Sequence, residues 1–291
     1  MDFQERFEMY KKMVGTELQS IMDRYIEIPI TLRKAMSYSL LSGGKRIRPV
    51  LLLAACDTFG GDMEQALPFA CAVEMIHPYS LIHDDLPGMD NDDLRRGCPT
   101  NHKVFGEGIA ILAGDGLLSY ASEIMLEAVE ARKTRDAALC IMKAAGVKGM
   151  VAGQVMDLES EGKAIDIDKL RYIHRNKTGA LLKAPLIAGA ILAEATDEQI
   201  EIMEEYGTNI GIAFQICDDL LDVVGDVEKM GKNTGSDKAT GKMTYPKAYG
   251  VEKTRKLVED YTDFAIASLD LLKGEKDFFV QIAKMLTGRE N

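Results

Sequence analysis

The sequence contains little that would divide the chain or direct it into a membrane. Its 291 residues include no Pro-, Gly- or Ser-rich connector near the middle and no low-complexity tract. The first residues, MDFQERFEMYKKM, mix both charges and lack the apolar segment of a signal peptide. The longest apolar runs are short or interrupted, and ALLKAPLIAGAILAEA carries Lys183 and Pro185. We therefore expect a single domain over residues 1–291 in a cytoplasmic protein, with no stable membrane insertion.

The chain also lacks a net positive charge and has few cysteines. The formal net charge of -11 argues against a nucleic-acid partner, because a phosphate backbone is held mainly by a basic surface. The five cysteines are scattered and form no CxxC pair, which argues against a disulfide framework and against a zinc cluster. Any basic site must therefore be local, and the cysteines are expected to be reduced.

Strand patterns are weak throughout, whereas apolar residues at i, i+3 and i+4 recur over long segments. Examples are ALPFACAVEMIHPYSLIHDDL and EQIEIMEEYGTNIGIAFQICDDLLDVVGD. Several of these segments are apolar on most faces, which suits central helices wrapped by outer ones. The pattern predicts an all-α, single-domain bundle of long helices.

The stretch SLIHDDLPGMDNDDLRRG concentrates acidic charge at the end of one apolar segment. Five carboxylates fall within ten positions: Asp84, Asp85, Asp90, Asp92 and Asp93. Like charges at this density repel one another unless a multivalent cation lies between them. Pro87 and Gly88 end the helix, and this break allows Asp90 to return toward Asp84. An EF-hand fails, because Arg95 would occupy the position of its invariant glycine.

A second acidic cluster ends another apolar segment, FQICDDLLDVVGD. Its carboxylates, at i, i+1 and i+4 of a helix, are those of Asp218, Asp219 and Asp222. Either cluster alone is explained as well by a solvated acidic helix terminus. Two clusters at the ends of apolar helices favour a metal site, and oxygen-only ligands favour Mg²⁺ shared with substrate phosphates.

Local basic groups accompany the acidic clusters. In LSGGKRIRPV, Pro49 indicates the first turn of a helix, so Lys45, Arg46 and Arg48 lie at an N-terminus suited to anions. Arg95 and Arg96 offer two planar guanidinium groups beside the first cluster. HRNKTGA adds Lys177 and Thr178, and the Gly- and Lys-rich stretch GDVEKMGKNTGSDKATGKMTYPK suggests a mobile lid. Taken alone, that stretch is better explained as solvated surface, and it does not match a Walker A motif.

Two acidic clusters and several basic groups on apolar helices describe a pocket for a molecule with a diphosphate head and a hydrocarbon tail. In these motifs the chain resembles the trans-polyprenyl diphosphate synthases, and within them the short-chain bacterial farnesyl and geranylgeranyl diphosphate synthases. The resemblance covers nearly the whole chain, from GGKRIRP through EMIHPYSLIHDDLPGMDNDDLRRG, AGQVMDLESEG, IHRNKTGAL and GIAFQICDDLLDVVGD to GKNTGSDKATGKMTYP. It implies an isoprenoid-synthase bundle around a central cavity, and a homodimer.

The resemblance also implies a role for each motif residue. Asp84, Asp85 and Asp90 match the first motif, DDxxxxD, and Asp218, Asp219 and Asp222 match the second, DDxxD; together they would hold three Mg²⁺ ions. Contacts to the allylic diphosphate are implied for Arg95, Lys177, Lys232 and Lys242. Contacts to isopentenyl diphosphate are implied for Lys45, Arg48, His77 and Arg96, and positions beside the reacting carbons for Thr178 and Gln215.

The reaction implied is ionisation of the allylic diphosphate in an apolar cavity, attack by the alkene of isopentenyl diphosphate, and loss of a proton. The departing diphosphate would serve as base, which explains why no dedicated base stands out. His77 is then a diphosphate ligand, and His83 is a helix residue with ordinary hydrogen bonds.

Product length depends on the helix before the first motif. Tyr79 and Ser80 lie five and four residues before Asp84, so Tyr79 would lie about 7 Å deeper at roughly 1.5 Å per residue. A ring there would form a floor that stops the product at fifteen carbons. We therefore expect a farnesyl diphosphate synthase, with geranylgeranyl diphosphate synthase as the alternative. Pro78 departs from the Thr or Ala expected in relatives and removes one helix hydrogen bond.

Two further alternatives are less well supported. A terpene cyclase would have Asn, Ser or Thr in its second metal motif and would not need a second diphosphate pocket. A non-catalytic partner subunit typically loses one acidic cluster, and both are complete here.

Overall fold

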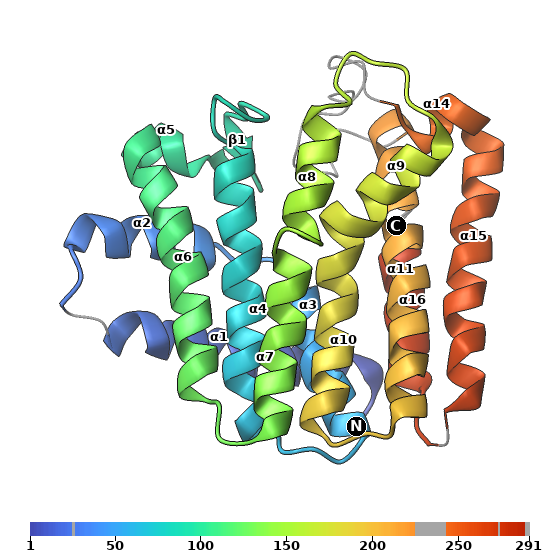
Figure 1. Cartoon of the computed structure of the whole chain (residues 1–291), viewed down its shortest axis with the longest axis horizontal. Coiled ribbons are helices and arrows are strands. Elements are labelled where there is room, and N and C mark those ends of the chain that lie inside the picture. The colour runs from blue at the N-terminus through green and yellow to red at the C-terminus, as the bar shows by residue number, and fades with distance from the viewer. Residues whose placement is uncertain (25–26, 225–242, 273, 289–291) are drawn as a thin grey trace. The chain divides into compact units, whose positions relative to one another are not determined.

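The computed structural model describes residues 1–24, 27–224, 243–272 and 274–288. Nearly all regular structure in these ranges is helical, as Figure 1 shows. The strands described are β1 (Leu94–Arg95) and β2 (Cys98–Pro99), which form one small antiparallel hairpin. The prediction of an all-α protein is confirmed.

Contacts group the chain into two compact units. The first comprises Met1–Leu139 and Ala188–Glu194, and the second comprises Cys140–Ile187 and Ala195–Asn291. The single domain over residues 1–291 and the central cavity therefore stay predictions.

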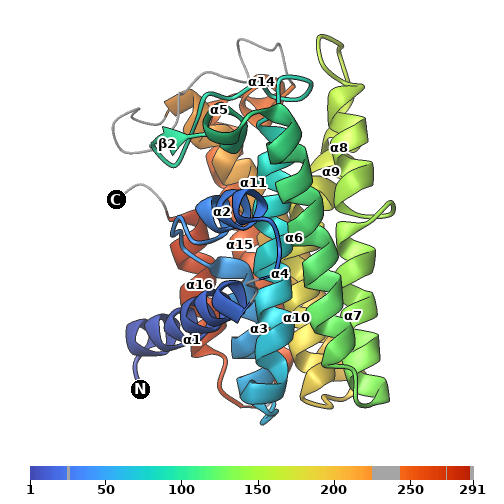
Figure 2. The ribbon, with the colours of Figure 1, turned by 90° about the vertical axis from the view of Figure 1, so that its left-hand side faces the viewer.

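The first unit is built around α4 (Met63–Asp84), which packs against α3 (Ile47–Thr58) and α6 (Glu107–Glu127). Its other helices are α1 (Phe3–Arg24), α2 (Ile30–Leu40) and α5 (Asn101–Phe105). Helix α4 begins at the cap residue Asp62, whose side chain accepts from two backbone amides, and it continues through Pro78 to Asp84. Figures 1 and 2 both place the β1–β2 hairpin near the end of α4 that carries the first acidic cluster.

The second unit is organised around α11 (Asp197–Val224), which packs against α15 (Val251–Ser268) and α16 (Asp277–Thr287). Helices α8 (Met150–Leu158) and α9 (Ile167–Ile173) are followed by a π-helix, η1 (His174–Gly179). The remaining elements are α14 (Tyr245–Tyr249) and the 3₁₀ turn η2 (Leu269–Leu271). Two helices have residues in both units: α7 (Arg132–Ala145) and α10 (Ala180–Leu192).

The cysteines and the apolar helices bear on two predictions from the sequence. All five cysteines are free thiols; Cys56, Cys71 and Cys217 are buried, whereas Cys98 is exposed. Two stretches of the described chain, Glu107–Glu127 and Arg132–Leu158, are long and apolar enough to cross a membrane. A core helix of a folded domain can have the same length and apolar composition, so these two stretches are weak evidence for a membrane span.

Candidate active site

The first acidic cluster forms where α4 ends. Helix α4 stops at Asp84, and the chain turns back so that the amide of Asp90 donates to the carbonyl oxygen of Asp84 at 2.8 Å. Asp84 is half-buried, Asp85 is only 3% exposed, and Asp90 is exposed. The predicted return of Asp90 toward Asp84 is confirmed.

Arg95 connects the β1–β2 hairpin to this cluster. Its Nε donates to Oδ1 of Asp85 at 2.9 Å, a terminal nitrogen contacts the same oxygen, and that nitrogen lies 3.1 Å from Oδ2 of Asp92. Burial raises the pKa of Asp85, and the Arg95 guanidinium partly offsets this effect. Burial lowers the pKa of Arg95, but the hydrogen bond to Asp85 and the charges of Asp85, Asp92 and Asp84 together raise it overall. A charged guanidinium therefore lies beside the first acidic cluster, as predicted.

Arg96 turns to a different partner. It has a left-handed backbone conformation, with φ of 54°, and its guanidinium donates to the carbonyl oxygen of Gly43. Gly44 has a φ of 123°, a conformation that favours glycine, and a Cβ there would lie 2.8 Å from a terminal nitrogen of Arg96. The two adjacent arginines therefore bind different segments: Arg95 binds the acidic cluster, and Arg96 binds the loop before α3.

The loop before α3 and the first turn of α3 carry two of the predicted isopentenyl diphosphate residues. Lys45 is exposed, and Arg48 lies in the first turn of α3, with its Nε buried and lacking a hydrogen-bond partner among the described residues. Burial lowers the pKa of Arg48 to about 10, with Glu74 raising it and Arg96 lowering it further. Burial and then Arg48 and Arg96 hold the pKa of the half-buried His77 well below its ordinary value. The structure thus brings Arg48, Arg96 and His77 into one electrostatic environment around an unsatisfied donor.

In the second unit, Lys177 and Thr178 lie on the π-helix η1, which packs between α8 and α11. A Cβ on Gly153 of α8 would lie 2.1 Å from the backbone nitrogen of Lys177, and a Cβ on Gly211 of α11 would lie 3.0 Å from Cα of Gly179. Lys177 donates to Oδ2 of Asp157 at 2.7 Å. π-Helical turns are frequent at functional sites.

The second acidic cluster occupies the last turns of α11. Asp218 is half-buried, whereas Asp219 and Asp222 are only 4% and 7% exposed. Asp219 accepts from the amide of Tyr245 at 3.1 Å and from Nε2 of Gln215 at 3.4 Å. Burying carboxylates is costly, so two at one helix end indicate a role other than a solvated terminus.

Comparisons with known proteins establish the family of this chain. A family model for polyprenyl synthetase matches residues 29–266. The chain belongs to the polyprenyl synthetase family. It is 53% identical over 240 residues to a farnesyl diphosphate synthase from Geobacillus stearothermophilus, covering 81% of this chain and 80% of that one. It is 43% identical over 285 residues to a farnesyl diphosphate synthase from Bacillus subtilis (strain 168), covering 97% and 96%.

The fold of this polyprenyl synthetase is also found among solved structures. Geranylgeranyl pyrophosphate synthetase from Pyrococcus horikoshii Ot3 is similar with a TM-score of 0.90 and 32% identity, covering 99% of this chain and 98% of that one. The predicted isoprenoid-synthase fold is confirmed.

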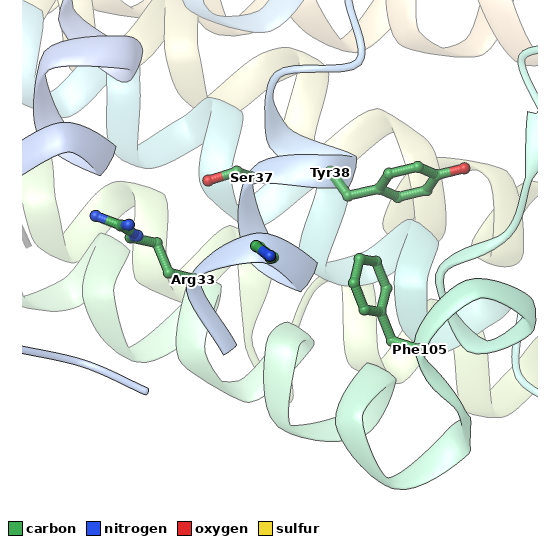
Figure 3. Close-up of a pocket in the computed structure, with 5 residues that line it drawn as sticks. Arg33, Ser37, Tyr38 and Phe105 are labelled. Carbon is green, nitrogen blue, oxygen red and sulfur yellow. The ribbon is translucent and has the colours of Figure 1, made fainter. Parts of the chain in front are cut away.

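Not all predicted site residues can be placed in this polyprenyl synthetase. Lys232 and Lys242 lie outside the described residues. Each acidic cluster is described within its own unit, so their joint action stays a prediction. A surface hollow lined by Arg33, Lys34, Ser37, Tyr38 and Phe105 contains none of the predicted residues. In Figure 3, the rings of Tyr38 and Phe105 approach each other, while Arg33 and Ser37 point away from them.

A smaller pocket does involve predicted residues of this polyprenyl synthetase. It lies beside the β1–β2 hairpin, and its lining includes Asp85, Arg95 and Arg96 as well as Pro78 and Asn101. The departure at Pro78 therefore borders the predicted site, in a helix that remains continuous.

Tyr79, the predicted floor residue, is half-buried on α4. Its ring packs edge-on against His83, with centroids 5.1 Å apart, and burial raises its pKa. Nε2 of His83 lies 3.0 Å from the carbonyl oxygen of Ile111 on α6. Ser80 donates to the carbonyl oxygen of His77 at 2.9 Å. His83 thus makes the ordinary contacts expected of a helix residue.

The structure also reveals neighbours that the sequence did not single out. His174 stacks on Tyr245, and its Nε2 lies 3.6 Å from Oδ1 of Asp219; burial lowers its pKa to about 3, so it is neutral. Gln154 buries both amide atoms without a hydrogen-bond partner in the described ranges. Gln154 and Asp157 lie in the AGQVMDLESEG motif, and His174 lies in IHRNKTGAL. Their presence in these motifs is the feature of the sequence that could have identified them.

Proposed function

We propose that this chain condenses isopentenyl diphosphate with dimethylallyl diphosphate and then with geranyl diphosphate to give farnesyl diphosphate. The observation that carries the proposal is the divergence of Arg95 and Arg96. Arg95 is bound to the acidic cluster, whereas Arg96 contacts the Gly43 carbonyl beside Lys45 and Arg48. Two separate cationic groups suit two diphosphates, as chain elongation requires and cyclisation does not.

Magnesium is the metal that fits the donor set. The two clusters offer only carboxylate oxygens, which suit Mg²⁺. Among the described residues, no three His, Cys, Asp or Glu side chains already converge as a complete metal site. Ions held here would therefore complete their coordination with substrate phosphates and water, as Mg²⁺ usually does. The residues that would hold them, three ions in all, are Asp84, Asp85, Asp90, Asp218, Asp219 and Asp222. When bound, Mg²⁺ supplies Lewis-acid stabilisation of the charge on the leaving diphosphate.

The chain's own residues orient the two diphosphates and stabilise their charge. Arg95, Lys177, Lys232 and Lys242 bind the allylic diphosphate, and Lys45, Arg48, His77 and Arg96 bind isopentenyl diphosphate. Arg48 is suited to binding a diphosphate, because its Nε is buried without a hydrogen-bond partner among the residues described. A buried donor gains a full hydrogen bond when an anion arrives. His77 enters the site neutral, since its pKa is held low. Thr178 and Gln215 lie beside the reacting carbons.

A homodimer in the cytoplasm is the proposed state of the enzyme. Helix α6 carries exposed apolar side chains at Ile111, Leu112 and Leu126, which are 43%, 55% and 69% exposed. We take these exposed apolar side chains as candidate positions of the dimer interface. The small diphosphate substrates are charged and water-soluble, which suits the cytoplasm. Light scattering of the purified protein should give twice the chain mass, and a monomer at micromolar concentration would contradict the dimer.

The test is incubation of the purified protein with dimethylallyl and isopentenyl diphosphates and Mg²⁺, followed by mass spectrometry of the products. We expect a linear fifteen-carbon diphosphate, and no product in excess chelator. A twenty-carbon product would favour the geranylgeranyl alternative. A cyclic hydrocarbon, or no prenyl product, would overturn the proposal.

A matched pair of variants tests whether the acidic motif itself is responsible. Asp84→Asn alters the proposed metal motif, whereas Asp93→Asn alters an exposed aspartate of the same stretch that is paired with Lys103 at 2.7 Å. The first should lose activity and the second should keep it. Equal loss in both would indicate a general effect of acidic charge.

A further inference from the structure

A buried ion pair involves the residue that lies between the proposed isopentenyl diphosphate residues Lys45 and Arg48. Glu74 on α4 is 2% exposed, and its Oε1 lies 2.5 Å from a terminal nitrogen of Arg46. The other terminal nitrogen of Arg46 donates to the carbonyl oxygen of Leu40 at 2.6 Å. Arg46 is itself only 8% exposed. With both terminal nitrogens engaged, Arg46 is part of the frame of the loop.

The backbone at Arg46 is held in a conformation that a non-glycine residue rarely adopts. Its φ of 52° is left-handed, and it is the residue immediately before α3. Such a conformation costs about 1–3 kcal/mol and persists only where surrounding contacts enforce it. The contacts to Glu74 and Leu40 are of that kind. They set the direction in which the chain enters α3, and therefore where Lys45 and Arg48 point.

Glu74 is also the acid among several cations. Its negative charge favours the charged forms of Arg48 and Arg96. In contrast, the charge of Arg46 disfavours the charged form of Arg96, and the charge of Arg96 disfavours the charged form of Arg48. Cations gathered in a partly buried place repel one another before any diphosphate is bound. A buried carboxylate in their midst reduces that repulsion. His77 lies one turn further along α4, and its pKa is lowered by burial and then by the same arginines.

We propose that Glu74 is a positioning residue for isopentenyl diphosphate. Through Arg46 it fixes the loop before α3, and through its charge it allows the cations of that pocket to assemble in advance of the substrate. Glu74 does not touch the substrate. This inference rests on the proposed function, because it assumes that Lys45, Arg48 and Arg96 bind isopentenyl diphosphate.

The principal test is the Glu74→Gln variant, which keeps the shape of the side chain and removes its charge. The KM for isopentenyl diphosphate should rise about 10-fold to 100-fold, as expected for a misplaced binding group, while the KM for the allylic substrate changes less than about twofold. The Kd of isopentenyl diphosphate, measured by calorimetry without the allylic substrate, should rise in parallel. Equal changes for both substrates, or none, would overturn the inference.

A control separates positioning from simple destabilisation. Asp57 also forms an ion pair with a buried arginine of the first unit, Arg6, at 3.2 Å, and it accepts from the Tyr10 hydroxyl at 2.5 Å. Asp57→Asn should lower stability and leave the ratio of the two KM values unchanged. If Asp57→Asn shifted that ratio as Glu74→Gln does, the effect would be general and the inference would be wrong.

A second variant covers the case in which Glu74→Gln does not fold. Replacing Arg46 by Met together with Glu74 by Leu removes both charges, and apolar replacement of a buried pair is often neutral or stabilising. The folded double variant should bind isopentenyl diphosphate more weakly than the wild type. The amides of residues 43–48 should exchange faster with solvent than they do in the wild type. Wild-type affinity in this variant would show that the pair serves stability alone. Failure of the wild-type protein to form any prenyl product would instead contradict the proposed function, and the amide-exchange result would still stand as a test of loop positioning.

Discussion

The contact between Gly153 and the π-helix offers a sharp test of how Lys177 and Thr178 are positioned. A Cβ on Gly153 would lie 2.1 Å from the nitrogen and 2.6 Å from Cα of Lys177, and 2.8 Å from the carbonyl carbon of Asn176. These are backbone atoms, so no side chain can rotate out of the way. Gly153→Ala must therefore separate α8 from η1.

The size of that separation follows from the contact distances. Ordinary contact begins at 3.4 Å, so α8 and η1 must move apart by about 1.3 Å to accept the methyl group. Overpacking of this kind costs about 1–3 kcal/mol, against about 1 kcal/mol gained when Ala replaces Gly in a helix. A displacement of about 1 Å at a substrate-positioning group can lower the rate about 100-fold. We therefore expect a modest loss of stability and a large loss of kcat/KM.

The assay is steady-state kinetics with varied allylic substrate, combined with urea unfolding. Gly15→Ala on α1 is the matched control, because a Cβ there meets nothing within 4 Å. It should keep wild-type kinetics and gain up to about 1 kcal/mol of stability. A folded Gly153→Ala enzyme with wild-type kcat/KM would refute the idea that this close approach positions Lys177 and Thr178.

Four further predictions follow from the site. Asp84→Ala and Asp218→Ala should each lower kcat about 100-fold or more at saturating Mg²⁺, and near wild-type turnover in either would contradict joint metal binding. Arg48→Ala should raise the KM for isopentenyl diphosphate much more than that for the allylic substrate, and the reverse would mean that the pockets are exchanged. Tyr79→Ala should shift the product from fifteen carbons toward twenty or more, whereas an unchanged product distribution would place the limit elsewhere. Because the pKa of His77 is lowered in the folded state, its contribution to stability is present above about pH 6.5 and is lost as the pH falls. Between pH 7 and 5, the free energy of unfolding of His77→Gln, measured in urea, should therefore fall by up to about 2 kcal/mol less than that of the wild type. Equal losses would contradict the shift.

Some features of the site depend on local sequence, and these were predictable. The Pro-Gly pair at 87–88 does end the helix that carries Asp84, and the chain does return Asp90 to it. The helix predicted at GGKRIRP begins at Ile47, within that motif, so Pro49 lies in its first turn as expected. Helix ends and apolar periodicity are set by residues a few positions apart, so a pattern in the sequence is sufficient to find them. The all-α class followed from the same periodicity.

The partners of the motif residues depend on contacts between distant segments. Nothing in the pair Arg95 and Arg96 shows that one binds Asp85 and the other the carbonyl of Gly43; the left-handed turn at Arg96 decides it. The salt bridge between Arg46 and Glu74 joins residues 28 positions apart.

In the same way, the sequence was sufficient to assign Lys177 and Asp219 to motifs predicted to bind substrate and metal, because residue type and spacing are local properties. Only the tertiary structure decided that Gly153 presses on the backbone of Lys177 and that the Tyr245 amide binds Asp219. Those contacts arise when separate helices pack side by side, and close packing selects one arrangement that spacing along the chain does not encode.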